Sequence, residues 1–137
     1  MIAILGWFVL LVSLFVRAAR RPARAAAQMF VPALIAIAYV LLIFEGMGAE
    51  GGGFGSIEEV RALFADDSAL AAGWLHYMAF DLFVGAWIVR DALEAGVPRL
   101  LLIPCLALTF LFGPSGLLLY LVLRLAFPAR APRENLQ

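Results

Sequence analysis

Long, nearly uninterrupted apolar segments constrain this chain more than any other feature of its sequence. They dominate its 137 residues, and 65% of all residues are hydrophobic. A soluble domain of this length cannot bury that much apolar surface, and soluble proteins average roughly 45 to 50% apolar residues. The sequence therefore predicts an all-α membrane protein.

Four of these segments predict four transmembrane helices in a small bundle, forming a single membrane domain over residues 1–137. The first segment is the weakest, since roughly 17 to 25 residues normally span a bilayer. No basic residue precedes it and arginines follow it directly, so we expect an uncleaved anchor rather than a signal peptide. The four segments are residues 1–16, 28–44, 74–90 and 100–125.

The charges between these segments predict the orientation. Basic loops stay on the cytoplasmic side of a membrane, whereas acidic residues count for little. The arginine-rich connection 17–24 is therefore expected inside, and both termini and the acidic, Gly-rich loop 45–67 are expected outside. On this count Arg17, Arg20, Arg21, Arg24, Arg90 and Arg99 lie inside, and Arg61, Arg124, Arg130 and Arg133 lie outside.

The Gly-rich loop contains a superficial nucleotide-binding pattern. Residues 46–51 fit G-x-G-x-x-G, but a dinucleotide site needs a preceding strand and a following helix, and here an apolar helix precedes the glycines. We therefore interpret this stretch as a loop. Ser56 and Glu59 resemble a capping box, which predicts a short amphipathic helix that lies on the membrane surface or packs on the bundle.

The third segment carries an ionisable residue, Asp81, deep in its apolar run. An unpaired carboxylate there would be costly, so Asp81 is expected to face the bundle interior and to mark a functional site. Tyr77 lies one turn earlier on the same face, while His76 lies about 140° away around the helix. Gly85 leaves space for a neighbouring helix or a ligand. A helix–helix hydrogen bond or an arginine pair would satisfy Asp81 without any chemistry.

The fourth segment contains Gly113-Pro114, which predicts a kink because proline removes a helical hydrogen bond. Such a kink leaves backbone carbonyls without helical partners, and within a membrane only protein or a cavity can satisfy them. The kink therefore marks a candidate site, and the alternative is a kink that serves helix packing alone. Tyr120 and Arg124 follow on one helix face. With four crossings, Asp81 is expected near Tyr39, Gly116 or Tyr120.

Two motifs in these segments resemble the abscisic acid deficiency 4-like family. They are Trp74-x-His76-Tyr77-x-x-Phe80-Asp81-Leu82-Phe83-x-Gly85-x-Trp87 and Thr109-Phe110-x-Phe112-Gly113-Pro114-x-Gly116. The resemblance implies a polytopic protein that acts on a carotenoid, since plant members are required to convert the epoxide violaxanthin into the allenic alcohol neoxanthin. We expect no plastid transit segment, and arginine is the only basic residue besides His76, which suits a relative in the bacterial inner membrane.

The implied reaction needs one group that removes a proton from carbon and another that protonates the epoxide oxygen, without a cofactor or metal. Burial disfavours the charged forms of a carboxylic acid and an imidazole, which eases proton exchange near neutral pH. We expect Asp81 as the base and His76 or Tyr77 as the acid of a carotenoid or retinoid isomerase. The expected substrate-binding residues are Trp74, Phe80, Phe83, Gly85, Trp87, Thr109, Phe110, Phe112, Gly113, Tyr120 and Arg124.

Other functions fit the same residues. A non-catalytic carotenoid-binding or photoprotective protein would use the aromatic residues to line a polyene groove, with Asp81 in a structural role. An ion or proton carrier is disfavoured because Asp81 has no relay. The zero net charge gives no reason to expect nucleic acid, and one His with one buried Asp is too few for a catalytic zinc site. The expected partners are a carotenoid or polyene and membrane lipids, and a homo-oligomer stays open.

Overall fold

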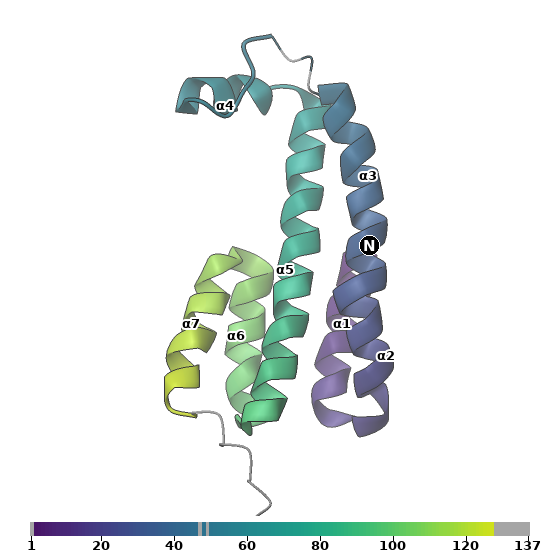
Figure 1. The fold of residues 1–137 in the computed structure, drawn as a ribbon, viewed down its shortest axis with the longest axis vertical. Coiled ribbons are helices and arrows are strands. Elements are labelled where there is room, and N and C mark those ends of the chain that lie inside the picture. Colours follow the sequence, from purple (N-terminus) through teal and green to yellow (C-terminus); the bar gives the residue numbers. More distant parts are fainter. Residues whose placement is uncertain (1, 47, 49, 128–137) are drawn as a thin grey trace, which may run out of the picture.

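The computed structural model describes residues 2–46, 48 and 50–127, and this part of the chain is all-α (Figure 1). Two helices are long and apolar enough to cross a membrane: a composite helix over Arg17–Gly46, of 30 residues, and α5 over Asp67–Ala95, of 29 residues. At about 1.5 Å per residue each exceeds the roughly 30 Å of a bilayer core. The all-α prediction is confirmed, whereas the remaining apolar helices are shorter than a crossing needs.

The composite helix begins much earlier than the second apolar segment. It consists of a 3₁₀ turn over Arg17–Ala19, α2 over Arg20–Ala25, a π-helical turn over Ala26–Phe30 and α3 over Val31–Gly46. The π turn ends two residues before Pro32, whose missing N–H removes one regular hydrogen bond of the helix. The arginine cluster predicted as a connecting loop is therefore helical, and the reversal after α1, which spans Ile2–Phe15, occurs at Val16.

Helix α5 extends beyond the predicted segment 74–90 at both ends because it has strong caps. The side chain of Asp66 accepts a hydrogen bond of 2.9 Å from the Ala69 backbone N–H at its start. Gly96 ends it in the left-handed conformation, with φ of 76°, which favours glycine. The apolar run marked only the central part of this helix.

The fourth apolar segment is a helical hairpin, and the prediction of one kinked helix over 100–125 is wrong. Helix α6 spans Arg99–Phe112, the chain turns at Gly113, and α7 spans Pro114–Leu125. Gly113 has φ of 43° and ψ of −97°, and Pro114 cannot donate the next hydrogen bond. Glycine tolerates this backbone and proline favours the first position of a helix, so the pair ends one helix and begins another.

The hairpin changes the predicted placement of Arg124. Figure 1 shows α6 and α7 side by side on one flank of α5, with α1 and α2 on the other, and α7 ending at the same end as α5. Arg124 pairs with Asp91 near the end of α5, so it shares the end of Arg20 and Arg90 rather than the opposite one. Arg124 and the end of α7 therefore lie on the arginine-rich side, whereas the sequence placed Arg124 on the outer side. Arg130 and Arg133 lie outside the described residues.

The opposite end carries α4, over Ile57–Leu63, which projects sideways from the top of α5 on the side away from α3 (Figure 1). The Ser56 side chain accepts a hydrogen bond of 3.1 Å from Glu59 N–H, which confirms the predicted N-cap. The Glu59 carboxylate accepts one of 2.9 Å from Gly55 N–H rather than from Ser56. The Gly-rich stretch is thus organised around its own helix cap.

Much of the surface is apolar, in keeping with a membrane environment. Large side chains such as Phe44, Leu100 and Leu125 are 70% to 82% exposed, which water would disfavour and lipid accommodates. The interior is a core formed by α1, α5, α6 and α7, in which Leu14, Leu82, Leu102 and Tyr120 are fully buried. This core surrounds the part of α5 from Leu82 to Ala92, directly after Asp81.

Candidate functional site

Asp81 lies against the turn of the α6–α7 hairpin. A Cβ atom added at Gly113 would lie 2.8 Å from Oδ1 of Asp81 and 3.2 Å from Oδ2, so the carboxylate touches the glycine backbone. The residue is half-buried, and its Oδ2 atom is buried without a hydrogen-bond partner among the described residues. A buried carboxylate oxygen normally has a partner, so this unpaired atom makes Asp81 the candidate reactive group at the turn.

Tyr77 connects the same face of α5 to α6. Its hydroxyl donates a hydrogen bond of 3.0 Å to the carbonyl oxygen of Phe110. That carbonyl lies in the last turn of α6, where the turn at Gly113 leaves helical carbonyls without partners. Asp81 and Tyr77 therefore flank the end of α6 from two successive turns of α5.

His76 lies in a different cluster. Its ring stacks on Phe80 at 4.5 Å between centroids and lies 5.6 Å from Tyr39 of α3. It is exposed on the α3 side of α5, whereas Asp81 meets the α6–α7 hairpin. Of the three neighbours considered for Asp81, Tyr39 contacts His76 instead, and the carboxylate lies against Gly113.

The aromatic residues expected to line one groove are divided among several places. Phe80 and Phe83 line a cavity of about 330 Å³ with Pro32 and neighbouring residues of the composite helix. Phe110 lines another, of about 360 Å³, between α1 and α6, where its ring meets Trp7 edge-on at 5.5 Å. The other three predicted aromatics line neither cavity: Trp74 packs on Tyr77, Trp87 on Tyr120, and Phe112 is exposed.

A second polar cluster, absent from the sequence interpretation, lies near the end of α5. Asp91 accepts a hydrogen bond from the Tyr120 hydroxyl and forms an ion pair of 2.8 Å with Arg124 Nε. Arg124 also donates to the carbonyl of Phe127. Tyr120 and Arg124 were expected in the substrate site, but they attach α7 to α5 here. Their i, i+4 spacing on one face was the available signal that an acidic partner faces them.

Three motif residues have clear packing roles. The space at Gly85 is occupied by the Trp7 ring, since an added Cβ would lie 2.6 Å from its Cη2 atom. The Thr109 hydroxyl is buried and donates a hydrogen bond of 2.8 Å to the carbonyl of Cys105. An added Cβ at Gly116 would lie 2.1 Å from the Thr109 nitrogen, so α6 and α7 approach closely there. These residues hold α1 against α5 and α7 against α6.

The groups at the hairpin turn can exchange protons. No group of three His, Cys, Asp or Glu side chains within residues 2–46, 48 and 50–127 is placed to hold a metal ion. The chemically active groups at the hairpin turn are one carboxylate and one phenol. Such a pair can move a proton.

Comparison with known proteins supports the resemblance. A family model described as ABA DEFICIENT 4-like matches residues 1–120 of the chain. The match includes both motifs, the two long helices and most of the α6–α7 hairpin. Comparisons with curated proteins and with solved structures give no significant match.

Proposed function

Because this chain belongs to the ABA DEFICIENT 4-like family, we propose that it is an integral membrane isomerase that acts on a carotenoid or related polyene lipid by acid–base chemistry. Family membership implies a function related to neoxanthin synthesis. The observation that carries the proposed chemistry is the Asp81 carboxylate, half-buried at the hairpin turn with one buried oxygen unpartnered among the described residues.

In the proposed reaction Asp81 is the base and Tyr77 is the acid. The ionised carboxylate takes a proton from a carbon atom beside the epoxide, the electron pair forms the new double bond, and the carbon–oxygen bond breaks. The departing oxygen receives a proton from the Tyr77 hydroxyl. Proton transfer between Asp81 and Tyr77 then restores the starting states, so the product is an isomer of equal mass.

The groove between α1 and α6 is the proposed binding site for the polyene. Its lining is almost entirely apolar, and it includes Trp7 and Phe110. Phe110 also provides the carbonyl that binds Tyr77, so one residue joins the groove to the proposed acid. Aromatic and aliphatic walls with a few polar groups are typical of sites for apolar ligands.

For the membrane placement, we propose that α5 and the composite helix 17–46 cross the bilayer with the arginine-rich end in the cytoplasm. The α6–α7 hairpin then enters from that side and returns to it. Non-helical backbone within a membrane needs shielding by protein, and Gly113 is buried against Asp81. The four separate crossings expected from the sequence give way to two crossings and this hairpin.

Expression in a carotenoid-producing host tests the proposal. The wild-type protein should shift the pigment profile toward an isomer of unchanged mass, measured by chromatography with mass spectrometry. Asp81→Asn, at matched expression, should remove the shift, while Glu50→Gln in the exposed loop should preserve it. A product of different mass, or full activity of Asp81→Asn, would contradict the mechanism.

A carotenoid-binding protein without catalysis is the second candidate, and the separation of His76 from Asp81 favours it. The sequence offered two acid candidates, and only Tyr77 shares the face of Asp81. Purification followed by pigment extraction separates the two functions. Bound carotenoid that stays chemically unchanged after prolonged incubation would support binding alone.

A further inference from the structure

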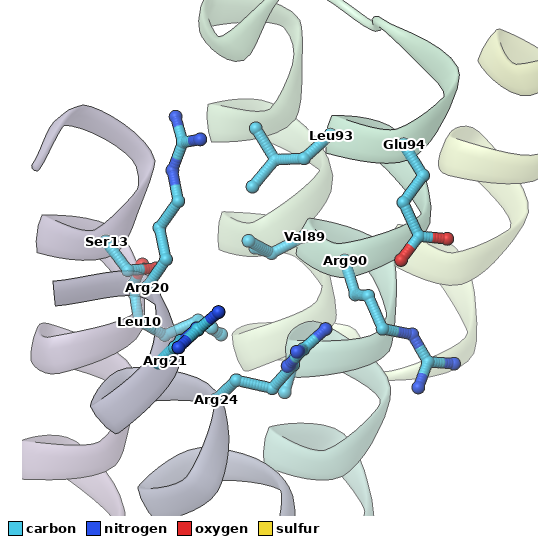
Figure 2. A pocket seen from close by; sticks show the side chains of 10 residues that line it. Leu10, Ser13, Arg20, Arg21, Arg24, Val89, Arg90, Leu93 and Glu94 are labelled. Atoms are coloured by element: carbon cyan, nitrogen blue, oxygen red, sulfur yellow. The ribbon is translucent and has the colours of Figure 1, made fainter. Parts of the chain in front are cut away.

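A pocket at the arginine-rich end lies apart from the Asp81 site. It has a volume of about 250 Å³ and opens between α2 and the last turns of α5 (Figure 2). Arg20, Arg21 and Arg24 come from one side, and Val89, Arg90, Leu93 and Glu94 from the other. Four arginines and one carboxylate give this small space a strong excess of positive charge.

The state of Arg20 indicates that the pocket is built for a ligand. Its Nε and Nη2 atoms are buried, and neither has a hydrogen-bond partner in the described part of the chain. Buried guanidinium donors without acceptors are costly, so such groups are normally paired. Arginines that serve only to orient a membrane protein have no such requirement, since they can extend into water.

The pocket supplies few acceptors of its own. The Ser13 hydroxyl donates to the carbonyl of Leu10 at 2.6 Å. Glu94 is exposed and forms no ion pair with any of the four arginines. Among the described residues no acceptor reaches the buried Nε and Nη2 atoms of Arg20, and an anion with several oxygen atoms would supply one.

We propose that this pocket binds a phosphate group, either in the headgroup of an anionic phospholipid or as a free phosphate. Guanidinium groups match phosphate oxygens with paired N–H donors, and basic pockets between membrane helices suit lipid headgroups. The partly apolar floor formed by Leu10, Ala86 and Val89 accommodates the start of a lipid chain. The site is independent of the carotenoid chemistry proposed for Asp81.

Thermal unfolding of the full-length protein in detergent tests the proposal with two ligands. One arm adds phosphatidylglycerol and compares it with phosphatidylcholine, and the other adds inorganic phosphate and compares it with chloride at equal ionic strength. A rise in Tm with phosphatidylglycerol alone identifies a lipid headgroup. A rise with inorganic phosphate alone identifies a soluble phosphate, and a rise with both supports the shared chemistry. No rise with either ligand overturns the proposal.

Charge-neutralising variants separate the pocket from general surface charge. Arg20→Gln and Arg24→Gln should each weaken binding about tenfold or more, because each removes charged hydrogen bonds to the ligand. Arg17→Gln is the matched control, since it removes one exposed arginine at the same end without lining the pocket. If Arg17→Gln weakens ligand binding as much as Arg20→Gln does, the binding reflects general surface charge and the proposal is overturned.

A gain-of-affinity variant keeps the test decisive if an arginine variant folds poorly. Glu94→Gln removes the one carboxylate among the described residues that line the pocket and should tighten phosphate binding several-fold. Direct titration, by native mass spectrometry for the lipid or by equilibrium dialysis for phosphate, measures this change. Unchanged or weaker binding in folded Glu94→Gln would contradict a site in this pocket.

Discussion

Asp91 of α5 and Arg124 of α7 form an ion pair with 2.8 Å between Oδ2 and Nε, and this pair fixes the direction of α7. The two residues lie 33 positions apart. Their contact requires the chain to reverse at Gly113, since a helix continuing from α6 would carry Arg124 away from Asp91. The Tyr120 hydroxyl binds the same carboxylate oxygen, so two groups of α7 are attached at one point.

Removing this attachment should destabilise the protein. Asp91→Ala leaves Arg124 and Tyr120 without their acceptor and should lower the free energy of unfolding by about 1 to 3 kcal/mol. Thermal or denaturant unfolding in detergent measures the change. Glu50→Ala, an exposed carboxylate in the loop, serves as the control. If the losses in unfolding free energy of Asp91→Ala and Arg124→Ala add up in the double variant, the two residues are not coupled, which would contradict the ion pair.

The reversal itself predicts which positions share one side of the membrane. In a Cys105→Ala background, single cysteines at Ala95 and Ala126 should both resist an impermeant thiol reagent in intact cells and react after lysis. A cysteine at Gly52 should react in intact cells, because it lies at the opposite end. Labelling of the Ala126 cysteine from outside would instead support a fourth helix that crosses the bilayer.

The turn at Gly113 should tolerate a side chain poorly. Gly113→Ala adds a Cβ at 2.8 Å from Asp81 Oδ1 and places alanine at a φ of 43°, so we expect a loss of about 2 to 4 kcal/mol in the free energy of unfolding. Gly96→Ala, with φ of 76° and open surroundings, isolates the backbone cost and should lose about 1 kcal/mol. Adding Asp81→Ala should recover part of the Gly113→Ala loss, and no recovery would argue against the contact.

The Trp7 ring should make Gly85 sensitive as well. Gly85→Ala places a Cβ within 2.6 Å of that ring and should cost about 1 to 3 kcal/mol in the free energy of unfolding. Trp7→Leu in the same chain should relieve much of this cost. Gly48→Ala is the control, since nothing lies within 4 Å of its added Cβ. Unfolding curves that do not distinguish Gly85→Ala from Gly48→Ala would exclude tight packing between α1 and α5.

The two acid candidates should differ in the pigment assay. Tyr77→Phe should lower isomer formation by about 10²- to 10⁴-fold, as expected for a general acid, because Tyr77 shares the face of Asp81. His76→Gln should retain activity within about tenfold, because His76 stacks on Phe80 away from that carboxylate. Matched membrane levels of both variants are the control. The reverse order of activities would assign the acid role to His76.

The apolar segments by themselves determined that this chain is all-α and suited to a membrane, because that conclusion depends only on the length and composition of local stretches. The N-cap at Ser56 and the packing of Asp81 against protein were predictable for the same reason: capping acts within one turn, and a carboxylate in an apolar run is costly unless protein shields it.

Contacts between distant residues decided the rest. Gly113-Pro114 predicts a break in the helix, but whether the chain bends or reverses there depends on the contacts of α7. In the structure the ion pair with Asp91 holds α7 beside α5, and the close approach at Gly116 holds it beside α6. The arginine-lined pocket likewise needs α2 to lie against the end of α5, because only then do Arg20 and Arg90 border one space. Local sequence reports burial and turn chemistry, whereas the partner of each polar group is set by how the helices pack.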